Sequence, residues 1–380
     1  MEWKEVTLGE VSSKIGDGLH GTPKYDDEGS YYFINGNNLN CGKIIIKDDT
    51  KRVGIDEFVK NQKELNEQTI LVSINGTIGN VAKYNNEPCI LGKSACYINV
   101  IKKVDKEFIY YVLTSANFKR NITNEATGTT IKNVSLKQMR EYKFYIPCNL
   151  ADQRRIASIL SSLDRKIELN NKINADLEEM AQAIFKNWFV DFEPFKDGKF
   201  VNSELGMIPE GWKVGILEDL ITIKYGKDHK KLEGGTFPVY GSGGLMRFVK
   251  SWLYNGESVL IPRKGTLDNI MYVCEKFWTV DTMFFSVPKM DYVMKYVYNY
   301  IKRFDFRKMN EGTSVPSNTA ARLNKMQILI PTQEVLEMYD KILCSIYNKR
   351  NMNTIESRTL SLLRDTLLPR LMSGEIEVPE

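Results

Sequence analysis

Two long stretches of the chain have the apolar spacing of a coiled-coil helix. With Ile156 taken as heptad position a, apolar residues recur every three and four positions through Trp188. The stretch contains no Gly or Pro until the pattern breaks at Glu193-Pro194. A second stretch keeps the same phase 183 residues later. The predicted seam positions are Ile156, Leu160, Leu163, Ile167, Asn170, Asn174, Leu177, Ala181, Ile184 and Trp188, followed by Tyr339, Ile346, Asn353, Leu360 and Leu367.

Each predicted helix has an asparagine at an a position, Asn170 in the first and Asn353 in the second. A buried Asn in such a seam lowers stability but fixes register and pairing. If the heptad assignment is one residue off, both side chains lie on the surface instead. A helix this amphipathic cannot cover its own apolar stripe, so we expect the two helices to pair with each other.

Between the helices, short β-branched or aromatic runs bounded by Gly, Asn or Pro turns predict strands. Two further segments, 106–115 and 293–303, have helical spacing and resemble one another. The predicted strands include 43–47, 69–74, 96–101, 258–262, 270–274 and 282–287.

The two halves of the chain carry the same blocks in the same order. "EWKEVTLGEV" from residue 2 resembles "GWKVGILEDL" from residue 211, and "FINGNNL" from 33 resembles "VYGSGGL" from 239. The two histidines of the chain, His20 and His229, are 209 residues apart. The spacing between matching blocks changes because loops differ in length, while their order is kept. Such a pattern indicates a duplicated domain. The most similar blocks align Leu71, Gly76, Thr77 and Asn80 with Leu260, Gly265, Thr266 and Asn269.

We therefore predict an α+β fold with two similar β-rich globular domains, related by a pseudo-twofold duplication and separated by two long helices. A pseudo-twofold axis requires these coiled-coil helices to be antiparallel. The predicted segments are a first globular domain (1–149), a central helix (150–193), a connector (194–208), a second globular domain (209–331) and a C-terminal helix with a tail (332–380).

Composition narrows the functional classes only slightly. The 380 residues carry a formal net charge of +4, which permits an acidic partner such as nucleic acid without requiring one. The six cysteines are scattered without a C-x-x-C pair, which argues against a zinc site and favours reduced thiols. The N-terminus lacks a secretion leader, and no apolar run approaches the roughly 20 residues of a membrane span. We expect a soluble, cytoplasmic protein.

The usual catalytic motifs are missing from the sequence. "LGKSA" at 91–95 resembles a phosphate loop, but Glu87 stands where that loop needs Gly. We find no G-x-G-x-x-G on a strand-to-helix turn, no G-x-S-x-G and no Asn-Pro-Pro-aromatic tetrad. Histidines in two different domains cannot form one triad or metal site. We therefore predict no catalytic, cofactor-binding or metal-binding residue in this chain, and interpret the loop acids Asp17, Asp228 and Asp268 as solvated or capping residues.

The repeated loops have a composition suited to nucleic acid: Gly for close backbone approach, Thr, Ser and Asn for base edges and phosphates, and Lys and Arg for charge. Alternatively, their Gly-Asn and Gly-Thr pairs only form tight turns. The apolar framework is shared between the copies while loop side chains change, which suits one scaffold that recognises two half-sites. Arg263 has the geometry for a guanine, and Asn37 or Asn80 for an adenine.

The candidate DNA-binding residues follow these loops in both halves. In the first half they are Lys14, His20, Lys24, Asn35, Asn37, Asn38, Asn75, Thr77, Asn80, Thr129, Thr130 and Lys132. In the second half they are Lys224, Lys227, His229, Lys230, Ser242, Arg263, Lys264, Thr266, Asn269, Thr313, Ser314 and Arg322.

The order of these features resembles a known family. A globular repeat is followed by "LADQRRIASILSSLDRKIELNNKINADLEEMAQAIFKNWFVDF", a second repeat that opens "PEGWK", and then "LLRDTLLPRLMSGEI". This arrangement, together with "GDGLHGTPKY" at 16–25, resembles the specificity (S) subunit of type I restriction–modification enzymes over essentially the whole chain. The resemblance implies two target-recognition domains that each recognise one part of a bipartite sequence in double-stranded DNA, while the helices set the spacer.

The resemblance also implies partners. Two methyltransferase (M) subunits would dock on the helices and bring S-adenosylmethionine, and restriction (R) subunits would use ATP and Mg; none of these cofactors is expected on this chain. The expected docking residues are Phe185, Trp188, Phe189 and Phe192, whose alternative role is intrachain core.

Two other classes of function remain as alternatives. One is a coiled-coil scaffold whose β domains bind protein or carbohydrate, and the other is a self-contained nuclease or methyltransferase. The sequence does not indicate the target bases or the spacer length.

Overall fold

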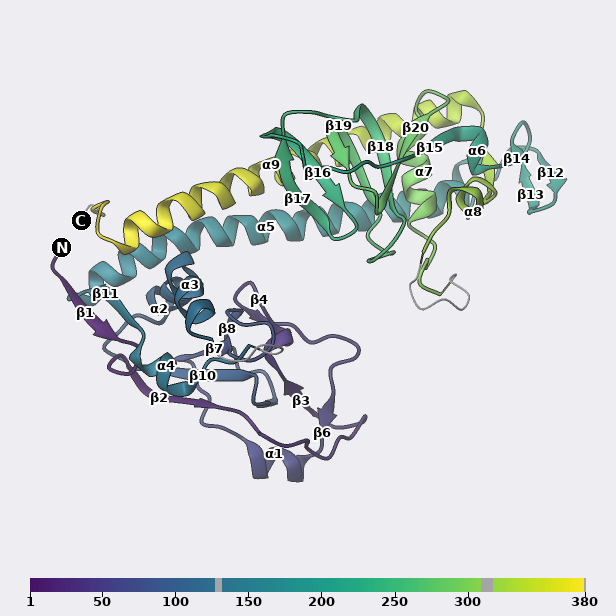
Figure 1. Ribbon diagram of the computed structural model, residues 1–380. Coiled ribbons are helices and arrows are strands. Elements are labelled where there is room, and N and C mark those ends of the chain that lie inside the picture. Colours follow the sequence, from purple (N-terminus) through teal and green to yellow (C-terminus); the bar gives the residue numbers. More distant parts are fainter. Residues whose placement is uncertain (127–131, 309–316, 379–380) are drawn as a thin grey trace. The chain divides into compact units, whose positions relative to one another are not determined.

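The computed structural model forms two compact units, which we call unit 1 and unit 2 (Figure 1). Unit 1 comprises Met1–Leu169 and Ile355–Glu380, and unit 2 comprises Asn170–Thr354. Two helices of 40 residues, α5 (Leu150–Phe189) and α9 (Gln333–Met372), contribute to both units. The structure describes residues 1–126, 132–308 and 317–378.

Unit 1 is built around a four-stranded antiparallel sheet in the order β2-β10-β7-β8. The central strands are β10 (Ala95–Val100) and β7 (Thr69–Ser73), and all their residues are buried, in keeping with their β-branched composition. The other elements are β1 (Trp3–Thr7), β2 (Ser12–Asp17), β3 (Tyr31–Ile34), η1 (Gly36–Asn38), β4 (Leu39–Asn40), β5 (Lys43–Ile44), β6 (Arg52–Val53), α1 (Ile55–Asn61), β8 (Val81–Lys83), β9 (Cys89–Leu91), α2 (Lys106–Thr114), α3 (Ala116–Glu125), α4 (Leu136–Glu141) and β11 (Lys143–Pro147).

Unit 2 contains a six-stranded sheet in the order β15-β20-β18-β19-β16-β17. Strands β18 (Tyr254–Pro262) and β20 (Met283–Pro288) pair antiparallel through a buried stretch. The other elements are η2 (Glu193–Phe195), β12 (Phe200–Ser203), β13 (Gly206–Pro209), β14 (Lys213–Ile216), α6 (Leu217–Leu220), β15 (Ile221–Tyr225), β16 (Gly234–Gly241), β17 (Gly244–Val249), β19 (Met271–Thr279), α7 (Met294–Ile301), α8 (Ala320–Asn324) and β21 (Gln327–Ile330).

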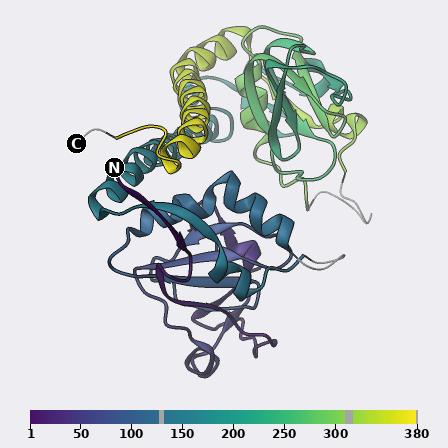
Figure 2. The same ribbon diagram turned by 60° about the vertical axis from the view of Figure 1, so that its left-hand side comes forward.

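The two units repeat one topology, which confirms the predicted duplication. The order β2-β10-β7-β8 corresponds to β15-β20-β18-β19. The register also corresponds, since Cys96 pairs with Val72 in unit 1 and Phe284 pairs with Ile261 in unit 2. Each unit also has one parallel strand pair, β3 with β9 in unit 1 and β16 with β19 in unit 2. Each has a separate antiparallel pair as well, β1 with β11 in unit 1 and β14 with β21 in unit 2. Figure 2 shows both units in a second view.

In unit 1 the first half of α5 packs antiparallel against the last part of α9. Leu160 of α5 and Leu368 of α9 are buried in the same core as the sheet. Asp164 accepts a 2.7 Å hydrogen bond from Arg364, while Lys166 lies 3.2 Å from Glu356. The partner number falls as the α5 number rises, so the two helices run in opposite directions, as predicted.

In unit 2 the seam between α5 and α9 contains the two predicted asparagines, and both are buried. Asn170 Nδ2 lies 3.5 Å from the carbonyl oxygen of Asn353, and Asn353 Nδ2 donates to Asn174 Oδ1 at 3.0 Å. Asn174 continues the layer with a 3.3 Å bond to Thr354 Oγ1. The heptad assignment is therefore correct, because a shift of one residue would have exposed both side chains.

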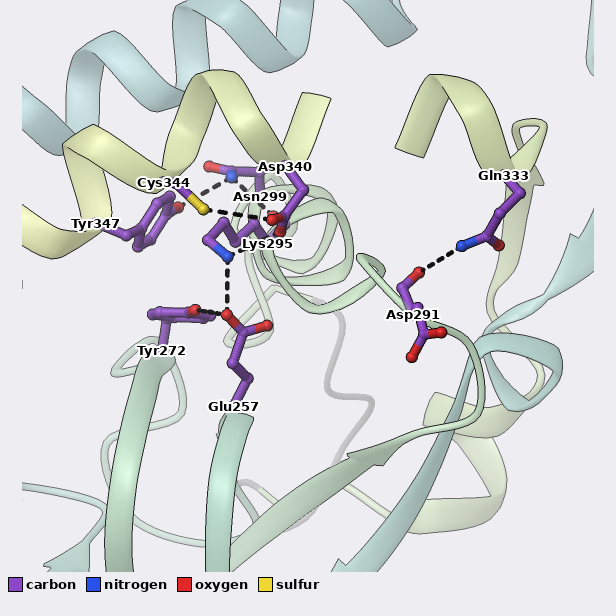
Figure 3. Close-up of polar contacts among 9 residues, drawn as sticks. All are labelled: Glu257, Tyr272, Asp291, Lys295, Asn299, Gln333, Asp340, Cys344 and Tyr347. Atoms are coloured by element: carbon purple, nitrogen blue, oxygen red, sulfur yellow. Dashed lines mark hydrogen bonds and ion pairs between the residues drawn. The ribbon is translucent and has the colours of Figure 1, made fainter. Parts of the chain in front are cut away.

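A buried ion network joins α7, β18 and α9 inside unit 2 (Figure 3). The Lys295 ammonium donates to Glu257 Oε1 at 2.8 Å and to Asp340 Oδ1 at 2.7 Å. Tyr272 donates to the same Glu257 oxygen at 2.7 Å. Each charged group thus has a partner of opposite sign, as burial requires.

The predicted connector contains a hairpin that the polar sequence pattern did not indicate. Strands β12 and β13 pair from Phe200 with Pro209 to Ser203 with Gly206. The turn is possible because Gly206 adopts φ 93°, a left-handed conformation that glycine adopts at little cost. No helix among the described residues is both long enough and apolar enough to cross a membrane.

Candidate nucleic-acid interface

Several loops of unit 1 meet at one end of its sheet. The Gly36 N–H donates to Ser94 Oγ at 2.9 Å, and that hydroxyl donates to Asn35 Oδ1 at 2.9 Å. The Ile74 N–H donates to the Ser94 carbonyl oxygen at 3.0 Å, and Asn75 Nδ2 donates to Asn133 Oδ1 at 3.2 Å. Ser94 therefore ties loops that are far apart in the sequence. The unit 1 loop cluster consists of residues 17–20, 35–38, 73–80, 92–94 and 132–133.

Unit 2 assembles the corresponding loops. Asn269 Nδ2 donates to the Ser242 carbonyl oxygen at 2.9 Å, and the Arg263 N–H donates to the Thr282 carbonyl oxygen at 2.8 Å. The Asn318 N–H donates to the Arg263 carbonyl oxygen at 2.9 Å. The unit 2 loop cluster consists of residues 226–229, 241–246, 263–269, 281–282 and 317–318.

Key backbone bonds of the two clusters correspond. The bond from Ile74 to Ser94 corresponds to the bond from Arg263 to Thr282, and the isolated bridge of Asn75 with Asn133 corresponds to that of Lys264 with Ser317. The repeated blocks of the sequence are thus repeated contacts in space.

A glycine in each cluster permits close backbone approach. A Cβ at Gly18 would lie 2.0 Å from the Leu91 carbonyl oxygen, and a Cβ at Gly226 would lie 2.0 Å from that of Val280. Only glycine fits at either place without a shift of the loop.

The same glycines correct the alignment of the histidines. Gly18 and Gly226 occupy equivalent places, so the offset in this loop is 226 − 18 = 208. The structural equivalent of His20 is therefore Asp228, and His229 lies one residue further along. The offset falls from 209 at Lys4 and Lys213 to 208 at Asp17 and Tyr225, so the second copy is one residue shorter before this loop. His20 is exposed and its Nε2 lies 2.7 Å from Asp17 Oδ2.

The side chains on this shared backbone differ in chemistry. Ile74 is buried, whereas the equivalent Arg263 is partly exposed and lies over the Tyr225 ring, 5.4 Å from its centroid. The exposed Lys93 of unit 1 has the exposed Asp281 as its counterpart. Two clusters that share a backbone arrangement but differ in their exposed side chains can recognise two different surfaces.

Most candidate DNA-binding residues lie at or near these clusters. In the part of the chain that the structure describes, the exposed candidates of the clusters are His20, Asn37, Thr77, Lys132, Lys227, Lys264 and Thr266, and the half-buried ones are Asn35, Asn75, Asn80, His229, Ser242, Arg263 and Asn269. Lys24, Lys224, Lys230 and Arg322 are exposed outside the ranges that define the clusters. Thr129, Thr130, Thr313 and Ser314 lie outside the described residues.

Asn38 and Lys14 are two further candidates whose side chains are bonded within the chain. Asn38 is buried; its Oδ1 accepts from the Asn35 N–H at 3.0 Å and its Nδ2 donates to the Ile45 carbonyl oxygen at 3.0 Å. This corrects its selection as a DNA-contacting residue, because the side-chain amide is used inside the loop. Lys14 forms a 3.0 Å ion pair with Glu64, whose hydrogen bond raises the pKa of Lys14.

Two acids of the unit 2 loop cluster have pKa values that their neighbours lower. A hydrogen bond from Arg307, at 2.6 Å, lowers the pKa of Asp268. The backbone N–H of Lys230 lowers the pKa of Asp228 in the same way. Among the residues that the structure describes, no group of three or more His, Cys, Asp or Glu side chains is placed to hold a metal ion.

Sequence reasoning missed Lys93 and Ser94, which lie in the middle of the unit 1 cluster. The "GKS" triplet fails as a phosphate loop, and that pattern does not mark its residues as part of a DNA surface. The available signal was its position between two apolar runs, β9 and β10, where a short turn had to present polar side chains.

The aromatic run of α5 is largely core. Phe185 and Phe189 are buried in unit 2, where Phe189 packs on Trp212 and Tyr339 with ring centroids 5.6 and 4.8 Å apart. This is the alternative role considered for them, and it leaves their side chains covered by the same chain. Trp188 and Phe192 are partly buried at the edge of this core.

Comparison with known proteins gives one consistent result. The family model of the type I restriction modification DNA specificity domain matches residues 1–179 and again 209–356. The type I restriction enzyme MjaIX specificity subunit of Methanocaldococcus jannaschii is 27% identical over 94% of this chain and 87% of its own. The HindI specificity subunit of Haemophilus influenzae is 23% identical over 71% of this chain and 77% of its own.

The fold agrees with this assignment. The crystal structure of a type I restriction–modification system S subunit from M. genitalium superposes with a TM-score of 0.58 at 21% identity, covering 100% of this chain and 97% of that one. Both matched copies of the specificity domain contain one of the loop clusters described above. The chain therefore belongs to the type I restriction–modification DNA specificity family, with two copies of the specificity domain.

Proposed function

We propose that the two loop clusters are the DNA-contacting surfaces of a type I specificity subunit, each of which binds one half of a bipartite target. The observation that carries this proposal is the matched backbone of the two clusters with unlike side chains at equivalent positions, such as Ile74 and Arg263. A duplicated scaffold with different polar tips is suited to two different base sequences.

The helices α5 and α9 would set the number of unread base pairs between the half-sites. Their seam is antiparallel and is held in one register by the buried layer of Asn170, Asn174 and Asn353. A fixed register gives a fixed length, which is the property that a spacer requires.

The chemistry would reside on partner subunits. Two methyltransferase subunits would bind S-adenosylmethionine and methylate adenines, and restriction subunits, where present, would use ATP and Mg. This chain would supply recognition and docking surfaces, with Trp188 and Phe192 as the more accessible members of the predicted docking run. We expect the assembly to act in the cytoplasm.

Methylation mapping tests the proposal directly. Cells that express this chain with its methyltransferase partner would carry either Asn37→Ala with Thr77→Ala or Arg263→Ala with Thr266→Ala. Each pair of substitutions should relax one half of the methylated sequence and leave the other half and the spacer unchanged. The proposal fails if either pair alters both halves equally, or if neither alters the target.

Two further measurements exclude the alternative functions. DNA binding by the complex should weaken steeply with salt, because phosphate contacts release counterions. A scaffold for protein or carbohydrate would show no salt-dependent affinity for DNA. Methyl transfer or cleavage by the purified chain alone would overturn the non-catalytic assignment.

A further inference from the structure

The hairpin of β16 and β17 presents two large apolar side chains within the unit 2 loop cluster. Leu245 is 40% exposed and Met246 is 54% exposed, immediately after the Ser242-Gly243 turn. Exposing such side chains to water is unfavourable, since their burial would be stabilising. Their position at a predicted DNA surface therefore calls for a ligand that covers them.

A β-bulge directs Met246. Val239 pairs with Arg247 and Tyr240 pairs with Leu245, so Met246 is the extra residue of β17. Bulges turn a side chain away from the regular alternation of a strand and are frequent next to functional sites. A Cβ at Gly241 would lie 2.5 Å from Met246 Sδ, so the methionine lies across the glycine at the end of the hairpin.

The turn that precedes the apolar tip is tied to a loop that carries two cationic side chains. Asn269 clamps the Ser242 carbonyl oxygen at 2.9 Å and thereby joins the hairpin turn to the loop that carries Arg263 and Lys264. Lys264 is exposed. The cluster also carries the exposed acids Asp268 and Asp281, so its charges are mixed. DNA is favoured over a second protein surface because the tip belongs to one of the two loop clusters proposed to contact DNA.

The equivalent turn of unit 1 differs, and the exposed apolar pair near the unit 1 cluster is instead Ile45 (36% exposed) and Ile46 (40% exposed), where the Ile45 N–H donates to the Asn38 carbonyl oxygen at 2.7 Å. Leu39 aligns with Leu245 in the repeated block, but Leu39 is fully buried, and the exposed residue of that turn is Asn37. The local backbone differs too, because this turn forms η1 in unit 1, with Gly36 and Asn38 buried, whereas in unit 2 strand β17 begins at Gly244 directly after the turn. The two units therefore differ in the kind of contact that they offer at this position.

We propose that Leu245 and Met246 form an apolar wedge that enters the DNA between two neighbouring base pairs of the half-site bound by unit 2. Side chains of this kind partly unstack a base step and kink the duplex when they insert. Pyrimidine–purine steps unstack most easily, so unit 2 would select such a step through its deformability, without a hydrogen bond to a base. This inference rests on the proposed function of the clusters and adds the mode of recognition in unit 2.

Thymine oxidation by permanganate tests the wedge, because unstacked thymines react faster than stacked ones. The assay uses the complex of this chain with its methyltransferase partner, bound to a duplex that carries the mapped target. For wild type we expect one reactive step in the unit 2 half-site. The variant Leu245→Ala with Met246→Ala should lose that reactivity, and its preference for the native step over a stiffer one should fall about tenfold. Met246→Gln, which keeps the length but is polar, should weaken the signal.

A matched control is available in the same unit. Met207 in the β12–β13 hairpin is 56% exposed, nearly the same as Met246, and lies outside the loop cluster. Met207→Ala should leave both the reactive step and the sequence preference unchanged. The unit 1 half-site serves as an internal control in every lane. All the substitutions lie in unit 2, so the permanganate reactivity of the unit 1 half-site, including any that methyltransferase action on adenine causes, should be the same for every variant.

Each other outcome counts against the wedge. A bound wild-type complex without a reactive step in the unit 2 half-site, or a step that stays reactive in the double variant, overturns the wedge alone. A double variant that no longer assembles with the methyltransferase shows that the tip is a protein interface. A wild-type complex that does not bind the duplex overturns the proposed function together with the wedge.

Discussion

Replacing Lys295 with methionine should destabilise unit 2 by about 3–5 kcal/mol at neutral pH, the usual cost of breaking a buried ion pair. The Lys295 side chain is 5% exposed and its partners Asp340 and Glu257 are 10% and 32% exposed. Methionine fills much of the lysine volume, so the loss would come from two carboxylates left without a cation. Most of it should arise at Asp340, because water can reach Glu257.

The pH dependence gives a second, independent expectation. Burial opposes the charge on Lys295, but hydrogen bonds to Asp340 and Glu257 more than offset this and raise the pKa of Lys295. A raised lysine pKa means that the folded chain binds the proton more tightly than the unfolded chain. Its contribution is therefore complete below the unfolded lysine pKa of about 10.4 and is lost as pH rises through the higher folded value.

Urea denaturation followed by tryptophan fluorescence measures the effect, since four of the five tryptophans lie in unit 2: Trp188, Trp212, Trp252 and Trp278. Lys341→Met is the matched control, because Lys341 forms an exposed pair with Glu337 on the same helix and should change stability little. Adding Asp340→Asn to Lys295→Met should restore most of the loss, because it removes the buried charge. A loss below about 1 kcal/mol for Lys295→Met would refute the reasoning, since a surface pair contributes that much.

Three further expectations concern the loops and the helix seam. Gly18→Ala should lower the free energy of unfolding by about 1–3 kcal/mol, measured by thermal melting, and weaken recognition of one half-site, because its Cβ would lie 2.0 Å from a carbonyl oxygen. Gly21→Ala is the control, since a Cβ there would meet open space, and it should change neither property. Equal effects of the two variants would contradict the close-approach argument. Asn170→Leu with Asn353→Leu should raise the melting temperature while sedimentation reveals additional oligomers; a single species with unchanged melting would argue against a register role. Arg263→Ala should relax the methylated sequence at one position at a cost of about 1–3 kcal/mol in binding, and a uniform loss over all sequences would indicate a phosphate contact instead.

Much of the architecture could be predicted from short-range patterns. Heptad spacing is a local property, so α5 and α9 and their polar layer at Asn170 and Asn353 followed from counting positions. The duplication was also visible, because repeated strands keep the same apolar residues in the same order. The hairpin of β12 and β13 was not, since its stability depends on one left-handed glycine, Gly206, in a polar segment.

The candidate site depended on contacts between distant segments. No local pattern distinguishes Asn37 from Asn38, yet one is exposed and the other is buried by bonds to its own loop. Lys93 became a candidate only when the fold brought its turn against the loops of residues 35–38 and 73–80.

By itself, the sequence determined two helices of coiled-coil type, a doubled β-rich domain and a set of polar loops, because periodicity and composition are properties of neighbouring residues. Only the tertiary structure decided which loops share one surface, which amides remain available there, and that Leu245 and Met246 are exposed while Leu39 is buried. Side-chain exposure depends on the path of the backbone and on atoms contributed by remote parts of the chain, and neither is encoded in the order of adjacent residues.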